Sequence, residues 1–349
     1  MKSLLYIRHA YHSKTKSNDF LIDILKSSFN ITLFDIDPYT QNIEEMLKSV
    51  PAKDFDVLLL FQLPIDGNLI KKYIKFKKGV FFPMFDGAPD RKNHIWLSWK
   101  DFNIINFSKT LHLELLNLGL SSFYIQYFPK PIDVGLGNEK SVFFWHRITK
   151  LNINIFEKIF KSLSIENVHI HKATDPQNEF VNPTLDNLNI EYSTWYNSKN
   201  DMLKDIEKCS IYIAPRLYEG IGMSFLEAMG MGRCVIATDT ATMNEYIVDG
   251  KTGILYDFDN PCLNKQYDIR AIQKNTFNYI NDGYIKWEKE KYKIINYIDY
   301  PVKIDKMKII LFKIKTLQVI KNLFSITNND TRTHKILTLM GFRFKFEIK

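Results

Sequence analysis

The sequence has only three cysteines and no long apolar run, and both absences restrict the classes of protein to which it can belong. Cys209, Cys234 and Cys262 stand singly, without a CxxC pair of the kind that holds a metal or forms a redox couple, which favours a reducing cytoplasm. No window of about 18 uncharged apolar residues is present, so no membrane-spanning helix is expected. The apolar run after Met1 is too short for a signal peptide and is typical of a first β-strand.

Net charge is absent from most of the chain. Residues 303–349 hold eleven Lys or Arg and three acids, whereas residues 1–302 are formally neutral. A basic tail on a neutral body indicates an anionic partner for the tail and argues against a nucleic-acid footprint over the whole protein.

The tail also has a pattern of its own. From Lys303 to Ile326, lysines interrupt a strongly apolar stretch, as in a segment that lies on an anionic membrane surface. Docking on the protein body with the lysine heads reaching solvent explains the same pattern. The final segment, ILTLMGFRFKFEIK, alternates apolar and basic residues like a short strand or hairpin.

A length of 349 residues suggests two domains, and short apolar runs alternate with helix-like stretches along most of the chain. The strands predicted for the first half are Leu4 to Ile7, Ile31 to Phe34, Val57 to Phe61, Val80 to Phe82, Ile104 to Phe107 and Tyr124 to Phe128. Those predicted for the second half are Val142 to Trp145, Val168 to Ile170, Ile211 to Ala214 and Val235 to Ala237. A cluster of Pro and Gly at 129–137 marks the linker. We therefore expect two doubly wound α/β domains, 1–135 and 136–302, with a tail at 303–349 and a ligand cleft at the carboxyl ends of both sheets.

The segment Pro215 to Gly230 follows a predicted strand and opens a helix. Gly220 and Gly222 let the backbone turn and approach a ligand closely, and the free N–H groups of the new helix are suited to a diphosphate. Glu227, one turn into the helix, can accept hydrogen bonds from two ribose hydroxyls, and Glu219 in the loop can meet a sugar. The same residues also fit an ordinary strand-to-helix turn, in which the glycines allow the backbone to turn and an acidic residue near the helix start interacts with the helix dipole.

Glu219 and Glu227 enclose seven residues, which resembles the E-x7-E motif of glycosyltransferase family 4, the glycosyl transferases group 1. The similarity runs from Pro215 to Tyr256 and includes the region of Glu245 and Gly253. The resemblance implies a GT-B fold, in which two Rossmann-like domains face each other across a cleft. It also implies transfer from a sugar nucleotide with retention at the anomeric carbon, and no essential metal. The triplet Asp35-Ile36-Asp37 has the letters of a metal motif but is more typical of a turn before Pro38.

The resemblance also implies roles for individual residues. Arg147 matches the arginine that the family places after the first strand of the second domain. The family also places a lysine five residues later, but Asn152 stands at that position. Lys150 is the nearest lysine and is out of register, and Lys172 or Arg216 could supply the positive charge instead. Lys150 and Lys172 are also typical of solvated surface lysines. The residues expected to contact the donor are Gly220, Ile221, Gly222, Met223, Ser224, Glu227, Arg216 and Lys150, and the expected catalytic residues are Glu219, Arg147 and Asp86.

The first domain departs from the family, because Arg8-His9-Ala10-Tyr11-His12 replaces the glycine-rich loop that often follows the first strand. Asp86 ends a predicted strand, with Gly87, Asp90 and His94 close behind, and a carboxylate there can orient the sugar or the incoming hydroxyl. A simple turn explains Asp86 equally well. Trp195 and Tyr196 are suited to stacking on a nucleobase, although buried aromatic residues more often belong to a core.

Together these features predict a retaining glycosyltransferase that moves a sugar from a UDP- or GDP-linked donor to a glycan or lipid-linked acceptor. The basic tail resembles extensions on lipopolysaccharide and capsule glycosyltransferases, which implies bacterial surface-glycan synthesis in the cytoplasm, peripherally on the membrane. A sugar-nucleotide epimerase or hydrolase and a catalytically silent scaffold are the alternatives.

Overall fold

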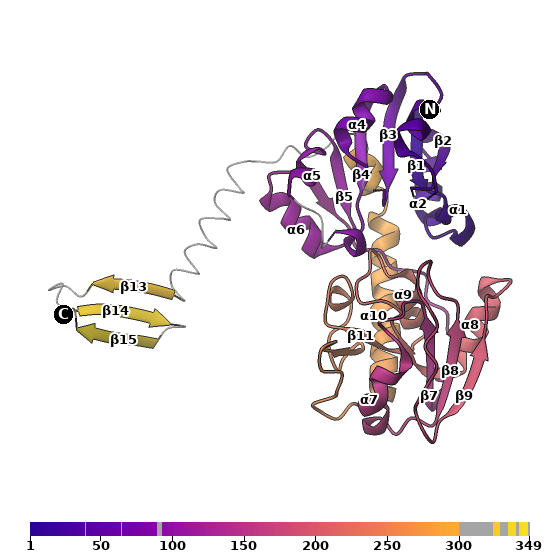
Figure 1. Cartoon of the computed structure of the whole chain (residues 1–349), viewed down its shortest axis with the longest axis vertical. Coiled ribbons are helices and arrows are strands. Elements are labelled where there is room, and N and C mark those ends of the chain that lie inside the picture. The colour runs from indigo at the N-terminus through magenta and orange to yellow at the C-terminus, as the bar shows by residue number, and fades with distance from the viewer. Residues whose placement is uncertain are drawn as a thin grey trace.

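The computed structural model describes residues 1–299, except 39, 64 and 89–92, together with three strands at 324–328, 334–339 and 342–347. Two six-stranded sheets, each with parallel strands throughout, form two lobes that we call the first and second domain (Figure 1). This agrees with the predicted pair of doubly wound α/β domains.

The first domain has the strand order β2-β1-β3-β4-β5-β6. Its strands are β1 (Lys2–His9), β2 (Phe29–Ile36), β3 (Phe55–Phe61), β4 (Phe76–Phe82), β5 (Asn103–Asn106) and β6 (Ser122–Tyr124). Its helices are α1 (Tyr11–Thr15), α2 (Asp19–Lys26), α3 (Ile43–Lys48), α4 (Gly67–Tyr73), α5 (Asn93–Leu97) and α6 (Lys109–Asn117), with a 3-10 turn, η1, at Phe85–Gly87.

The second domain has the order β12-β11-β10-β7-β8-β9. Its strands are β7 (Asn138–His146), β8 (Asn167–Lys172), β9 (Asn189–Ser193), β10 (Cys209–Ile213), β11 (Cys234–Thr238) and β12 (Ile254–Tyr256). The helices that follow in sequence are α7 (Glu157–Ser162), α8 (Lys199–Glu207), α9 (Met223–Gly230), α10 (Ile269–Glu290) and α11 (Lys293–Asp299), with 3-10 turns η2 (Ile153–Phe156) and η3 (Met243–Glu245).

The predicted strand from Tyr124 to Phe128 is wrong in most of its length, because β6 ends at Tyr124. Tyr127 and Phe128 are nevertheless buried, and they pack on α10 instead of extending the sheet. The Tyr127 ring lies 5.1 Å from that of Trp287, and a Cβ placed on Gly283 would come 2.2 Å from the Phe128 ring. An apolar run before a Pro-rich linker therefore marks an interdomain contact here.

The last helices tie the second domain back to the first. Helix α10 runs from one lobe to the other, and α11 packs against the first domain (Figure 1). The Tyr297 ring stacks on Phe123 with centroids 5.1 Å apart, and Lys2 pairs with Asp299 at 2.6 Å. The chain thus crosses between the domains twice, which limits how far they can separate.

Glu245 forms a second joint between the domains. From η3 in the second domain, its carboxylate accepts hydrogen bonds from the backbone N–H groups of Lys109 at 2.6 Å and Thr110 at 2.9 Å, and from the Ser108 hydroxyl at 2.9 Å. A carboxylate at this position satisfies the free donors at the start of α6 and interacts favourably with its dipole. Glu245, which belongs to the motif region, therefore fixes the orientation of the two domains.

The three strands near the C-terminus are β13 (Phe324–Asn328), β14 (His334–Leu339) and β15 (Phe342–Glu347), and they form a separate antiparallel sheet. The pairing of β14 with β15 confirms the hairpin predicted for the last segment. The predicted amphipathic stretch lies outside the described residues up to position 323. No helix in the described ranges has both the length and the apolar character needed to cross a bilayer.

Replacing Glu245 with Ala is expected to lower the free energy of unfolding by about 2 kcal/mol, because three charge-assisted bonds at the start of α6 are lost. Denaturant unfolding measures this difference. Glu166→Ala, which removes a carboxylate from an exposed pair with Lys140, serves as the control and should change stability by less than about 0.5 kcal/mol. Equal effects of the two substitutions would contradict the role given to Glu245.

Candidate active site

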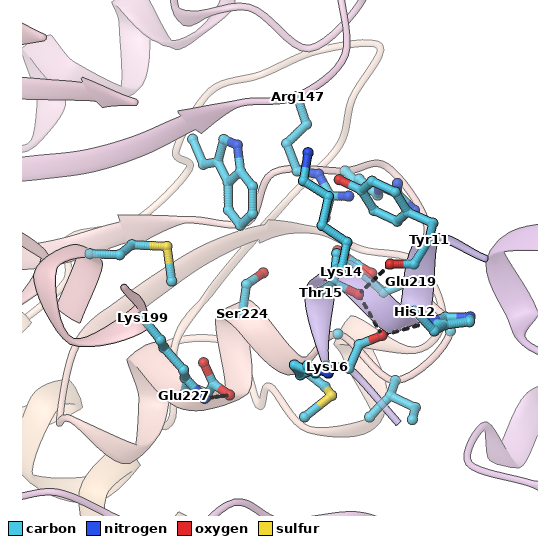
Figure 2. A pocket seen from close by; sticks show the side chains of 18 of the residues that line it. Tyr11, His12, Lys14, Thr15, Lys16, Arg147, Lys199, Glu219, Ser224 and Glu227 are labelled. Atoms are coloured by element: carbon cyan, nitrogen blue, oxygen red, sulfur yellow. Dashed lines mark hydrogen bonds and ion pairs between the residues drawn. The ribbon is translucent and has the colours of Figure 1, made fainter. Parts of the chain in front are cut away.

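A cavity of about 690 Å³ lies between the domains, at the carboxyl ends of both sheets (Figure 2). The first domain contributes α1 and the ends of β3 and β4, and the second domain contributes the ends of β7 and β8, the start of α8 and the loop from β10 to α9. The predicted position of the cleft is therefore confirmed. Among the residues expected to contact the donor, Arg216, Gly220, Ile221, Gly222, Met223, Ser224 and Glu227 line this cavity, as do Glu219, Arg147 and Asp86.

Two glycines shape the loop between β10 and α9. Gly222 caps α9 with φ of +79°, a left-handed conformation that L side chains rarely adopt. A Cβ on Gly220 would come 2.6 Å from the Cβ of Met84, so the loop passes very close to the first domain. The backbone N–H groups at the start of α9 have no partner within the helix, and the residues that carry them, Met223 and Ser224, line the cavity.

Glu219 is buried, with a relative exposure of 6%, and its Oε1 has no hydrogen-bond partner among the described residues. Burial raises the pKa of its carboxyl to about 7, although the nearby guanidinium groups of Arg216 and Arg147 favour the charged form. The side chain therefore keeps its proton to a higher pH than an exposed glutamate does. A buried oxygen without a partner, facing a cavity, is available to a ligand hydroxyl.

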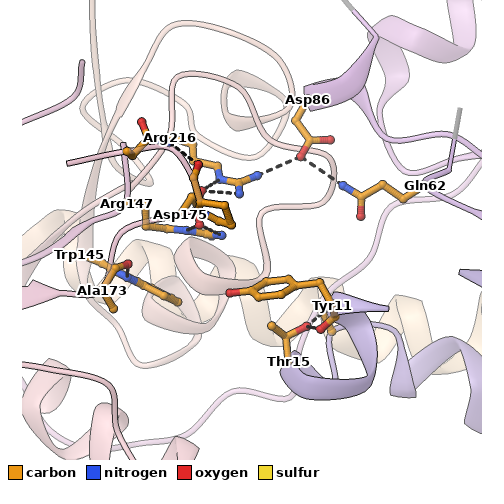
Figure 3. A network of polar contacts seen from close by, with 12 residues as sticks. Tyr11, Thr15, Gln62, Asp86, Trp145, Arg147, Ala173, Asp175 and Arg216 are labelled. Atoms are coloured by element: carbon orange, nitrogen blue, oxygen red, sulfur yellow. Dashed lines mark hydrogen bonds and ion pairs between the residues drawn. The ribbon is translucent and has the colours of Figure 1, made fainter. Parts of the chain in front are cut away.

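Arg147 and Arg216 lie side by side because both bind Asp175 (Figure 3). Asp175 Oδ1 accepts from Nε and NH2 of Arg147 at 3.0 and 2.8 Å, and Oδ2 accepts from Nε and NH2 of Arg216 at 3.1 and 2.6 Å. The planar guanidinium groups are thus each held in two-point contacts. The sequence analysis assigned no role to Asp175.

Arg216 extends this network to the first domain. Its NH1 donates to Asp86 Oδ2 at 3.2 Å, and Gln62 donates to the same oxygen at 3.4 Å. Burial works to lower the pKa of Arg216, but the surrounding carboxylates of Glu219, Asp175 and Asp86 outweigh it and raise that pKa. Arg216 is therefore a permanent cation at the centre of the cleft.

Asp86 fits both alternatives left open by the sequence, because it lies in the 3-10 turn η1 and also faces the cavity. Burial raises the pKa of its carboxyl despite the nearby Arg216 and Arg147. Its Oδ1 is buried and has no partner within the described residues. Asp86 and Glu219 thus each present one unused oxygen.

Glu227 lines the cavity on α9, and its Oε1 accepts a hydrogen bond from Lys199 Nζ at 2.6 Å (Figure 2). Burial raises the pKa of Glu227, and the Lys199 ammonium opposes this shift. Lys199 comes from the first turn of α8, and nothing in the sequence singled it out, because a lysine at a helix start is an ordinary surface residue.

Lys150, predicted to contact the donor, is not among the residues that line the cavity. Strand β7 ends at His146, and the exposed ammonium of Lys150 lies 4.8 Å from the centre of the Phe258 ring instead. Lys172, an alternative partner for Arg147, lies over the rings of Phe180 and Tyr192 and does not line the cavity either. Of the alternatives considered, Arg216 is the one that lies beside Arg147.

Two predicted aromatic residues have different surroundings. Trp195 lines the cavity and is 49% exposed, whereas the ring of Tyr196 stacks on His171 at 4.5 Å and its hydroxyl donates to Asp205 at 2.7 Å. Both residues line the cavity, but the exposed Trp195 contacts only the Lys14 ammonium among the ring contacts described, whereas Tyr196 is held in place. Asp90 lies outside the described residues.

The unusual segment after β1 folds into the short helix α1. Arg8 is buried and donates to Asp35 at 2.7 Å and to Asn18 at 3.0 Å. Asp35, the first residue of the Asp35-Ile36-Asp37 triplet, therefore forms an ion pair with Arg8. His12 is buried beside Phe61, and burial lowers the pKa of its imidazole to about 4. Within the described residues no group of three or more His, Cys, Asp or Glu is placed to hold a metal ion.

Residues 139–264 match the sequence model of the family described as "Glycosyl transferases group 1". Among curated proteins, an uncharacterized glycosyltransferase of Methanocaldococcus jannaschii is 34% identical over 64 residues, which cover 18% of each chain. Alpha-maltose-1-phosphate synthase of Mycolicibacterium smegmatis is 33% identical over 54 residues, covering 16% of this chain and 14% of that protein. The matches thus span less than a fifth of the curated relatives' length.

The solved structures cover far more of the chain. Anabaena HepE in complex with UDP-glucose aligns over 91% of this chain and 100% of its own, with a TM-score of 0.53 and 14% identity. The lipopolysaccharide outer core galactosyltransferase WaaB aligns over 81% and 99%, with a TM-score of 0.50 and 14% identity. At this identity the likeness concerns the fold, which is the predicted GT-B fold.

Replacing Glu219 with Gln is expected to stabilise the protein at pH 8 more than at pH 5. The unfolded carboxyl ionises near 4.5 and the folded one near 7, so stability falls as the pH rises between these values and stays low above them. In the wild type, the resulting loss in free energy of unfolding is on the order of 3 kcal/mol, and the glutamine variant does not show this loss. Thermal unfolding of both proteins at the two pH values measures it, and an equal change at both would contradict the raised pKa.

Proposed function

We propose that this chain, whose residues 139–264 belong to the glycosyl transferases group 1, transfers a sugar from a nucleotide-sugar donor to a hydroxyl of a glycan or lipid-linked acceptor. The observation that carries the proposal is the interdomain cavity, where the buried Glu219, the partly buried Glu227, two arginines and the start of a helix converge. Each group suits one part of such a donor.

The diphosphate of the donor suits the cationic side of the cavity. The N–H groups at the start of α9 and the guanidinium groups of Arg147 and Arg216 offer both hydrogen bonds and positive charge. These groups stabilise a departing diphosphate most when its negative charge grows in the transition state. Because Asp175 holds both arginines in advance, little reorganisation is needed when the bond breaks.

The two glutamates suit the sugars of the donor. Glu227 stands on the first turns of α9, where its carboxylate can accept hydrogen bonds from the ribose hydroxyls. Glu219 faces the cavity beside the arginine pair, where its free oxygen can accept a bond from the transferring sugar. Asp86, on the opposite wall, is positioned to orient that sugar or the incoming acceptor hydroxyl.

We propose that the reaction retains the anomeric configuration, as the family resemblance implies. The bond between the anomeric carbon and the phosphate oxygen breaks, and its electrons go to the diphosphate. The acceptor oxygen then bonds to the same face of the carbon, and its proton passes to the departing diphosphate. The protein's part is to orient the two substrates and to neutralise the leaving group.

Of the UDP- or GDP-linked donors predicted, similar structures favour a UDP-linked one, and one of them favours a role in bacterial surface glycans. HepE binds UDP-glucose, and WaaB is a lipopolysaccharide outer core galactosyltransferase. A lipid-linked acceptor also fits a peripheral position on an anionic cytoplasmic membrane surface through residues 303–349.

The first test is a calorimetric binding screen of the full chain against UDP, GDP, ADP and CDP, then against sugar conjugates of the nucleotide that binds. Glu227→Ala is expected to weaken nucleotide binding at least about tenfold, because the ribose contacts are lost. Absence of binding to all four nucleotides would contradict the donor site. Release of free sugar or an epimer, with no transfer to any acceptor, would instead indicate a hydrolase or epimerase.

Arg147→Ala is expected to lower kcat by about 10² to 10³ and to change donor affinity much less, because the arginine acts chiefly on the charge that develops on the leaving group. Steady-state kinetics separate the two effects. Lys161→Ala, which removes an exposed cation paired with Glu157, is the control and should leave both constants unchanged. A loss confined to KM would contradict this role for Arg147.

Truncation after residue 302 is expected to abolish binding to vesicles of anionic lipid and to preserve nucleotide binding. The reason is that the excess positive charge of the chain lies in residues 303–349. Sedimentation with vesicles of phosphatidylglycerol measures the first effect and calorimetry the second. If the truncated protein still sediments with the vesicles, the tail is not the membrane contact.

A further inference from the structure

We infer that Lys14 and Lys16, on the wall of the cavity formed by the first domain, bind a phosphate group carried by the acceptor. The inference rests on the proposed transferase function and specifies the chemistry of its second substrate.

Most of the charges that line the cavity are already paired within the protein. Arg216 pairs with Asp86 and Asp175, Arg147 pairs with Asp175, and Lys199 pairs with Glu227.

Lys14 and Lys16 also line the cavity, and neither forms a salt bridge within the part of the chain that the structure describes. Two cations on one short segment, facing a cavity without a carboxylate partner, raise the local affinity for an anion.

Lys14 reaches across the cleft. Its ammonium lies 4.6 Å from the centre of the Trp195 ring, which belongs to the second domain. Trp195 is half-exposed, so this cation–π contact is open to solvent and weak. A charged oxygen is a stronger partner for an ammonium group than an exposed ring, so a phosphate entering the cavity can draw Lys14 away from Trp195.

Lys16 ends α1 in a left-handed conformation, with φ of 58°. Glycine or asparagine is the usual residue at this position, because a Cβ is unfavourable there. A lysine is therefore locally disfavoured at 16, where the residue lines the cavity. Lys16 is exposed, so its ammonium group is available to an anion that enters the cavity.

The chemistry of the pair favours phosphate. Lysine ammonium groups are compact point charges on flexible stems, which suit the dispersed oxygens of a phosphate better than the planar two-point geometry that arginine provides. The second domain already offers the donor diphosphate the start of α9 and the arginine pair. The anion that meets α1 on the opposite wall therefore belongs to the acceptor, either as a phosphorylated sugar or as the diphosphate of a lipid-linked glycan.

The test is calorimetric titration of the full chain with glucose 6-phosphate and glucose, and with farnesyl diphosphate and farnesol. Each titration is made with and without a saturating amount of the nucleoside diphosphate that binds among UDP, GDP, ADP and CDP. The wild type is expected to prefer a phosphorylated probe over its neutral counterpart by at least about tenfold. A preference confined to glucose 6-phosphate indicates a phosphorylated sugar, and one confined to farnesyl diphosphate indicates a lipid-linked diphosphate.

The double variant Lys14→Gln, Lys16→Gln is expected to lose this preference and to keep nucleoside diphosphate binding within about twofold. Lys53→Gln is the matched control, because Lys53 is an exposed lysine of the first domain that lies 4.8 Å from the Phe55 ring outside the cavity. It should change neither affinity.

Three results would overturn the inference: no preference for phosphorylated probes in the wild type, an equal loss in Lys53→Gln, or an equal loss of nucleoside diphosphate binding in the double variant. The last result would assign both lysines to the donor. If no nucleotide binds but the lysine-dependent preference persists, the anion site stands and the proposed transferase function fails. The two failures are therefore distinguishable.

Discussion

The structure depends on one chain of charged contacts across the cleft, from Arg147 through Asp175 and Arg216 to Asp86. Buried charges are unfavourable unless they are paired, and here one aspartate supports two guanidinium groups while the second arginine binds the other domain. The same contacts therefore hold the domains together and keep two cations ready beside the cavity. Removing Asp175 leaves both cations without their shared partner.

Glu219 is the clearest sign that this arrangement serves a ligand. Its burial, its raised pKa and an oxygen without a hydrogen bond all reduce the stability of the folded chain. Asp86 shows the same combination on the facing wall. The buried Glu219 and the partly buried Asp86 both line one cavity beside fixed cations, and each has an oxygen without a hydrogen-bond partner in the described residues. Such an arrangement is typical of a site that binds a polar ligand.

Much of the fold and part of the site could be predicted from the sequence, because buried parallel strands and a glycine-rich loop have strong local signals. The motif from Glu219 to Glu227 lies where it was expected. The roles of Asp175 and Lys199 were not predicted, because they arise from contacts between distant segments. Asp175 pairs with Arg147 and Lys199 pairs with Glu227, and the residues of each pair are 28 positions apart. Lys150 lies away from the lining of the cavity, a position that spacing along the chain could not show because it does not reveal which way a loop turns after its strand.

Every role proposed for the cleft requires that the interdomain cavity binds the nucleotide-sugar donor. A crystal structure of the full chain with the nucleoside diphosphate that it binds tests this requirement. We expect the diphosphate within hydrogen-bond distance of Arg147, Arg216 and the start of α9, and the ribose hydroxyls on Glu227. A nucleotide bound elsewhere, with both arginines still engaged only by the protein's own carboxylates, would contradict it.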